Sequence, residues 1–151
     1  MNNIIDSFYS LYSNNCSLVV DCRGDSPAIL YWGSRLANTT SPDMLALLAT
    51  SQELQASLLQ EAPIGLSPQS AAGFSGSPGV QLHRDGFQWA VYTRIESVSL
   101  IDNKLTIVSI CQGTQIQLTH CLVLDYKTDV LAATTEIVNM GESSLWLNRC
   151  D

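Results

Sequence analysis

The sequence has few charged residues and very few cations. Charged side chains make up 14% of its 151 residues, with only 7 lysines and arginines against 14 aspartates and glutamates. The net charge of −7 would repel a phosphate backbone, so the composition argues against nucleic-acid binding. No cluster of basic residues is present that could bind an anionic lipid surface.

The N-terminus lacks the pattern of a targeting segment. In MNNIIDSFYSLYSNN, serine, asparagine and aspartate interrupt the apolar residues, and the first cationic side chain is Arg23. This pattern indicates neither a signal peptide nor a membrane-spanning helix. We therefore expect a cytoplasmic protein without a membrane partner.

The five cysteines lack the spacing of a metal site. None belongs to a CxxC pair, and their odd number does not suit a framework of disulfides. We interpret them as reduced thiols, most of them packed as small hydrophobic side chains. No metal ion and no cofactor are expected.

Familiar catalytic motifs are absent as well. The chain has no GxSxG, HExxH, GxGxxG or Walker sequence, and GFSGSPG lacks the lysine of a phosphate-binding loop. The carboxylates are scattered, with no spacing that pairs two of them for acid–base chemistry. Of the two histidines, His120 lies on the apolar side of an expected strand, which favours a packed imidazole. His83, in QLHRDG, suits a functional site and a hydrogen-bonded junction equally well.

What the sequence does contain is mostly the pattern of β-strands. SLVVDC and PAILYW indicate a hairpin, because the turn-forming residues GDSP connect the first segment to the start of the second. From Phe87 onward, beginning with FQWAVYTRI, polar and apolar residues largely alternate, and Asp102-Asn103 suits a tight turn. In the segment TQIQLTHCLVLDY one face is apolar and the other polar. Roughly eight antiparallel strands predict a mainly β protein with a β-sandwich architecture.

Two segments depart from this pattern. SPDMLALLATSQELQASLLQ begins with capping residues and places its leucines near one helical face, so we expect a short helical insertion, one or two helices, within residues 41–60. Residues 62–86 hold three of the five prolines and five of the nine glycines. This composition indicates a long ordered loop without a strand or helix, a kind of segment that often carries function.

The stretch AILYWGSRL combines aromatic rings, a glycine and an arginine. Sugars bind through an apolar ring face on an aromatic side chain and through charged or amide groups on their hydroxyls. Trp32 and Arg35 could supply both, with Gly33 turning the chain between them, although the same residues could simply pack at a strand end. Trp89 and Trp146 are more typical of core or sheet packing. The candidate residues for a substrate pocket or an interface are Trp32, Arg35, His83 and Arg84.

Three motifs follow one another from Val19 onward. They are YWG at Tyr31 to Gly33, L-x-P…G-x-x-G-x-P…H-R within GLSPQSAAGFSGSPGVQLHRDG, and LDY-x-TDVL…N-x-G near the C-terminus. The second falls on Leu66, Pro68, Gly73, Gly76, Pro78, His83 and Arg84, and the third on Leu124 to Leu131 with Asn139 and Gly141. In this order they resemble the N-terminal domain of the melibiase-type α-galactosidases of glycoside hydrolase family 36.

The resemblance implies a large, supersandwich-like β-sandwich that packs on a (β/α)8 catalytic barrel. In that family the nucleophile and the acid/base aspartate belong to the barrel, and no residue here matches their motifs, so this chain is assigned no catalytic residue. In tetrameric members, loops of the domain reach the active site of a neighbouring subunit. The resemblance thus implies that the domain supports the galactose pocket and builds a homo-oligomer.

We therefore expect residues 1–151 to be one N-terminal β-sandwich domain of an α-galactosidase-like protein. We expect it to be truncated before its catalytic barrel, because the family's domain is longer and the last expected strand has no capping element after it. The complete enzyme would hydrolyse terminal α-galactosides with retention, whereas this chain alone would be inactive. Two alternatives stay open, namely a stand-alone carbohydrate-binding module that uses Trp32 and a purely structural module.

Overall fold

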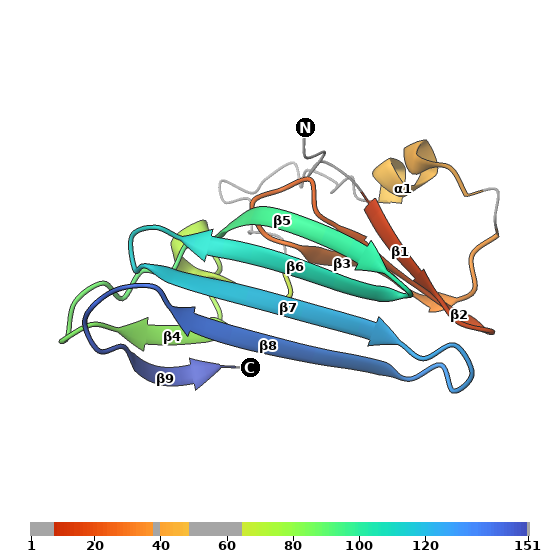
Figure 1. Ribbon diagram of the computed structural model, residues 1–151. Coiled ribbons are helices and arrows are strands. Elements are labelled where there is room, and N and C mark those ends of the chain that lie inside the picture. The colour runs from red at the N-terminus through yellow and green to blue at the C-terminus, as the bar shows by residue number, and fades with distance from the viewer. Residues whose placement is uncertain (1–7, 38–39, 49–64, 151) are drawn as a thin grey trace, which may run out of the picture.

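The computed structural model describes residues 8–37, 40–48 and 65–150 (Figure 1). Within these residues the strands form three antiparallel sheets, with strand orders β1-β2-β3, β4-β9 and β5-β6-β7-β8. The first sheet contains β1 (Phe8–Tyr12), β2 (Cys16–Asp21) and β3 (Ala28–Ser34). The third contains β5 (Arg94–Ile101), β6 (Lys104–Cys111), β7 (Ile116–Leu124) and β8 (Leu131–Asn139). The second sheet is a two-stranded ribbon of β4 (Val80–His83) and β9 (Trp146–Cys150).

The sheet of β5 to β8 is an antiparallel meander with one buried face. Along β7 the predicted apolar face, Ile116, Leu118, Leu122 and Leu124, is buried, and the alternate residues Gln117 and Thr119 are more exposed. Asp102 and Asn103 form the turn between β5 and β6, and both have positive φ angles, of 48° and 62°. Positive φ at both central residues is the signature of the type I′ hairpin turn, so the turn predicted there is confirmed.

The hairpin predicted from SLVVDC and PAILYW is also confirmed, as β2 and β3. Its register contains a bulge, because Val19 pairs with Tyr31 and Val20 pairs with Ile29, which leaves Leu30 without a partner. A bulge of this kind re-aims the side chains that follow it. Figure 1 shows this sheet behind the sheet of β5 to β8, in the two-layer arrangement of the predicted β-sandwich.

Two apolar clusters hold the layers together. The larger joins β1 and β2 to β6 and β7, and consists of Leu11, Leu18, Val20, Cys22, Leu105, Ile107, Leu122 and Leu124. The smaller packs the β4–β9 ribbon and the chain before β5 on the other end of the large sheet, through Val80, Leu82, Val91, Cys111, Ile116 and Leu118. Each fully buried leucine or isoleucine contributes about 1.5–3 kcal/mol of transfer free energy, so both clusters matter for stability.

The predicted helical insertion begins where expected. Helix α1 (Pro42–Leu48) follows Ser41, whose hydroxyl accepts a hydrogen bond from the Met44 amide at 3.3 Å, as an N-cap should. The part of the expected helices over residues 49–60 lies outside the described residues.

Two local predictions are wrong. The segment expected as a loop over residues 62–86 contains the strand β4 and a short 3-10 helix, η1 (Ser70–Ala72). Strand β4 pairs with β9, far along the chain, so no local pattern revealed it. The strand expected from Phe87 begins only at Arg94. Gln88 has a positive φ of 58°, and the amide of Thr93 donates to the side chain of Gln69 (2.8 Å), so residues 88–93 do not continue a ladder.

Candidate functional site

The four predicted site residues lie on two different sheets. Trp32 is on β3, and Arg35 follows that strand, whereas His83 ends β4 and Arg84 follows it. The structure therefore keeps Trp32 near Arg35 and His83 next to Arg84, as in the sequence, and places the two pairs on different sheets.

Trp32 extends from an edge strand, and 52% of its surface is exposed. Its register partner is Leu18, so the indole shares a sheet face with the main core. Gly33 lies within β3 and does not turn the chain, in contrast to the prediction. Instead, the Tyr31 side chain lies close over Gly33. A Cβ at Gly33 would stand only 2.9 Å from the Tyr31 hydroxyl, so the missing side chain leaves room for this ring. That hydroxyl donates to the Ser34 carbonyl at 2.8 Å.

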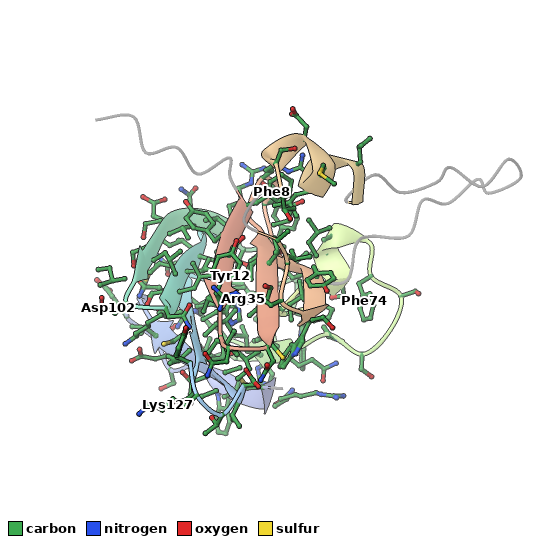
Figure 2. The ribbon with its side chains drawn as sticks, turned by 90° about the vertical axis from the view of Figure 1, so that its right-hand side faces the viewer. Phe8, Tyr12, Arg35, Phe74, Asp102 and Lys127 are labelled. Atoms are coloured by element: carbon green, nitrogen blue, oxygen red, sulfur yellow. The ribbon has the colours of Figure 1, made fainter. Side chains whose placement is uncertain are left out.

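Arg35 forms a hydrogen bond with the backbone of the turn between β1 and β2. Its Nη1 donates to the Ser13 carbonyl at 2.7 Å, and its guanidinium carbon lies 5.8 Å from the centre of the Tyr12 ring. Figure 2 shows Tyr12 and Arg35 beside one another at the end of the sandwich that faces the viewer. One donor of Arg35 is thus committed to the backbone, while the residue itself remains exposed.

Arg84 is a buried residue, with 6% of its surface exposed. Its guanidinium donates to the carbonyls of Thr114 and Gln115 in the β6–β7 turn, and to Asn139 Oδ1 and the Ser143 carbonyl beyond β8. Among the described residues no carboxylate forms an ion pair with it. Arg84 therefore connects two turns that are distant in sequence to the end of β4.

The contacts of Arg84 also explain why two of the sequence motifs occur together. Asn139 accepts from both Arg84 and the Gly141 amide, and a Cβ at Gly141 would stand 2.6 Å from Arg84 Nη2. The H-R motif and the N-x-G motif thus meet in one contact, in which the missing side chain of the glycine leaves room for the guanidinium.

His83 lies between two exposed tryptophans. Its ring centroid is 4.4 Å from that of Trp89 and 6.3 Å from that of Trp146, with the second pair nearly parallel at 14°. Trp89 and Trp146 are 55% and 59% exposed, so neither packs in the core, whereas Trp146 does pack on a sheet surface, against its cross-strand partner His83. Sequence analysis missed this aromatic row because Trp146 meets His83 only through the pairing of β4 with β9.

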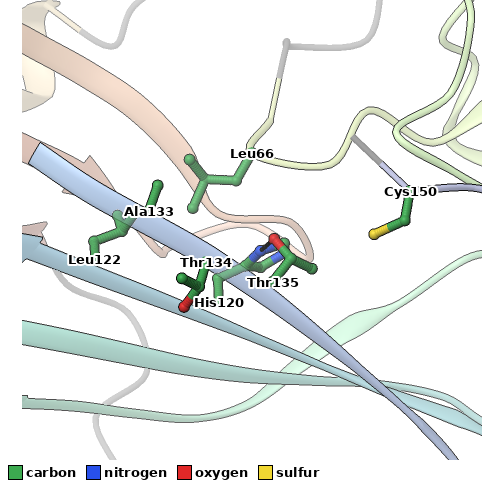
Figure 3. A pocket seen from close by; sticks show the side chains of 7 residues that line it. All are labelled: Leu66, His120, Leu122, Ala133, Thr134, Thr135 and Cys150. Atoms are coloured by element: carbon green, nitrogen blue, oxygen red, sulfur yellow. Dashed lines mark hydrogen bonds between the residues drawn. The ribbon is translucent and has the colours of Figure 1, made fainter.

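A pocket of about 350 Å³ lies beside the inner face of β7 and β8 (Figure 3). Its lining consists of Leu66, His120, Leu122, Ala133, Thr134, Thr135 and Cys150. His120 is only 4% exposed, and its ring nitrogens lie 3.0 Å from Thr135 Oγ1 and 3.4 Å from Ser67 Oγ. The predicted packed, hydrogen-bonded imidazole is confirmed, and burial lowers the pKa of His120 below its usual value.

The buried His120 gives a testable pH dependence. Unfolding exposes an imidazole with the ordinary pKa of about 6.5, whereas the folded protein keeps it neutral to lower pH. The contribution of His120 to the free energy of unfolding is therefore complete above about pH 6.5. It should be lost as the pH falls below 6.5 and through the lowered pKa, with a slope of at most about 1.4 kcal/mol per pH unit. Urea unfolding between about pH 5.5 and 7.5 measures this slope above most of the range in which carboxylates titrate.

The control for this prediction is the second histidine. The variant H120Q should lose most of the slope, while H83Q, at the half-buried position beside Trp89, should keep it. A slope that survives in H120Q would contradict the assignment to His120. The carboxylates of Asp21, Asp125 and Asp129 have lowered pKa values, so they weaken folding only under more acidic conditions.

The described residues offer few other sites for chemistry. All five cysteines are free, and burial raises the pKa of the Cys22 thiol to about 12, which makes it unreactive. Over residues 8–37, 40–48 and 65–150, no three histidine, cysteine or acidic side chains come together as metal ligands would. In the same ranges no helix has the length and hydrophobicity needed to cross a membrane.

Comparison with protein families decides the relationship of the chain. The model of the glycosyl hydrolase family 36 N-terminal domain matches residues 25–151. The chain belongs to this family. The resemblance of the three motifs is thus confirmed, and the match covers every described strand from β3 onward in addition to the helical insertion.

Solved structures with the same fold include several α-galactosidases. The enzyme from Lactobacillus brevis has a TM-score of 0.77 at 13% identity, over 98% of this family 36 chain and 23% of its own length. The galactosidase domain of the α-galactosidase-sucrose kinase AgaSK has a TM-score of 0.75 at 11% identity, covering 99% and 24%. AgaB from Geobacillus stearothermophilus has a TM-score of 0.70 at 16% identity, covering 96% and 23%.

These identities establish a shared fold and no more. The chain spans about a quarter of each solved chain, 23–24%. Comparison with curated proteins gave no match.

Proposed function

We propose that the chain is the non-catalytic N-terminal domain of an α-galactosidase, and that it supports the substrate pocket and the assembly of a homo-oligomer. The observation that carries the proposal is the family match over residues 25–151. It is supported by solved α-galactosidases that contain the same fold, in which the matching part makes up 23–24% of the solved chain. The partner would be a (β/α)8 catalytic barrel in the same chain, and the location would be cytoplasmic.

The edge strand β3 offers a surface for such a partner. Trp32 and Ile29 are 52% and 42% exposed, and their register partners Leu18 and Val20 belong to the main core. The apolar face of the β1–β2–β3 sheet is therefore covered by the large sheet at β2 but stays partly exposed at β3. A neighbouring barrel or subunit could bury this strip, with Arg35 as a charged group at its end.

The proposal is first tested on the chain by itself. The purified 151-residue chain should release no nitrophenol from an aryl α-galactoside. Sequencing of the source transcript beyond codon 151 should show an open frame that encodes a barrel with paired aspartate motifs. Measurable turnover by the chain alone would contradict the non-catalytic role, whereas a stop codon directly after codon 151 would contradict the barrel in the same chain and favour a stand-alone module.

The complete enzyme tests the role of β3. We expect W32A to raise the KM for raffinose, the sugar bound in one solved relative, AgaA from Geobacillus stearothermophilus, or to shift the oligomer to smaller species on gel filtration. The control is Y126A, which removes an aromatic residue that is 55% exposed in the β7–β8 turn. Unchanged KM and unchanged oligomer size in W32A would contradict the role of this strand.

A further inference from the structure

The outer face of the β4–β9 ribbon carries polar and aromatic side chains side by side. Along β4, Val80 and Leu82 are buried while Gln81 and His83 point to the other side. Their register partners on β9 are Arg149 and Trp146. Because directly paired residues share a face, this side of the ribbon carries one amide, one guanidinium, one imidazole and one indole.

Trp89 extends this face to a row of three rings. The chain turns back after β4, with the Arg84 amide donating to the Phe87 carbonyl at 2.9 Å, and this turn brings Trp89 to within 4.4 Å of His83. The order of the rings is therefore Trp89, His83, Trp146. Both indoles are more than half exposed, and Phe87 beside them is 74% exposed.

Trp89 and His83 are held in place by hydrogen bonds at their ring edges, and both indoles remain more than half exposed although each contacts His83. Trp89 Nε1 donates to the Gly86 carbonyl at 2.7 Å, and the Gly86 amide donates to His83 Nδ1 at 3.1 Å. Since Nδ1 accepts that bond, the ring proton of His83 is on Nε2, where it can be donated to a ligand. Fixing the rings before binding lowers the entropy lost when a ligand stacks on them.

We propose that this face, with its row of Trp89, His83 and Trp146, binds a pyranose sugar. One or two sugar rings would stack their C–H faces on the indoles, while His83 Nε2 and the Gln81 amide would bind hydroxyl groups. The net charge of −7 disfavours an anionic ligand such as a nucleotide, and membership of a glycosyl hydrolase family makes a neutral glycoside the fitting occupant. This goes beyond the proposed function, which assigns the face no ligand.

The test is titration of the 151-residue chain with raffinose, melibiose and methyl α-glucopyranoside, followed by tryptophan fluorescence and by calorimetry. We expect saturable binding that W146A and W89A each weaken about tenfold or more. The conservative variants W146F and W89F should retain part of the affinity, because a smaller ring still stacks. Circular dichroism checks that each variant is folded.

The matched control is Y126A, which removes an aromatic side chain of similar exposure, 55%, from the β7–β8 turn. It should bind sugar like the unchanged protein. Loss of binding in Y126A, binding that W89A and W146A leave unchanged, or no binding of any of the three sugars would overturn the inference. So would a change of oligomer size in W146A without sugar binding, because the row would then be an interface between copies. Binding by the chain and KM of the complete enzyme are separate readouts, so this inference and the proposed function can fail independently.

Discussion

Replacing Arg84 by lysine is expected to lower the free energy of unfolding by about 3 kcal/mol. The guanidinium donates to two carbonyls of the β6–β7 turn, to Asn139 and to Ser143, and it is nearly inaccessible to water. A lysine ammonium has three donors at one point and cannot reach acceptors on both sides. It would leave the buried Thr114 carbonyl or the part-buried acceptors without partners, and a buried unpaired group costs about 1–3 kcal/mol.

Urea or thermal unfolding of R84K measures this loss. The control R94K changes an arginine whose side chain is 71% exposed and whose Nε lies 3.6 Å from Asp25, a surface pair worth little. We expect R94K to unfold within about 0.5 kcal/mol of the unchanged protein. If R84K unfolded at the same denaturant concentration as R94K, the assignment of Arg84 as the connection between the two turns would be wrong.

The second large effect is expected at Asn103. Its side-chain oxygen accepts from the Tyr12 amide at 2.9 Å, and its side-chain nitrogen donates to the carbonyls of Tyr12 (2.8 Å) and Leu124 (2.6 Å). One amide thus joins the β5–β6 turn to β1 in the other sheet. The residue also has a φ of 62°, which asparagine and glycine tolerate and alanine does not.

Two substitutions separate these contributions. N103G keeps the backbone conformation and loses three hydrogen bonds, so we expect a loss of about 2 kcal/mol in unfolding free energy. N103A adds the strain of the left-handed conformation and should lose about 3 kcal/mol in total. The difference between the two, from urea unfolding, measures the backbone strain. Equal stability of N103G and the unchanged protein would show that the bridge to Tyr12 contributes nothing.

The sequence by itself determined the class of the fold and most of the strands. Alternation along β7 set which residues face the core, because side chains of a strand alternate between its two faces whatever they pack against. The residue pair Asp102-Asn103 set the turn, because it accepts positive φ at both positions. The family was also accessible, because its motifs keep their order along the chain. The strand and turn signals each lie within a few neighbouring residues, and so does each single motif of the family.

Only the tertiary structure decided the roles of the polar and aromatic residues. The pattern of QLHRDG places His83 beside Arg84, yet one is half-buried beside a tryptophan and the other is fully engaged in the interior. These roles depend on the pairing of β4 with β9 and on turns near residues 114 and 139, and local periodicity carries no information on such distant partners. The turn at Asn103 was predictable, whereas its bridge to Tyr12 was not, because the two residues are 91 positions apart and meet only when the two sheets pack.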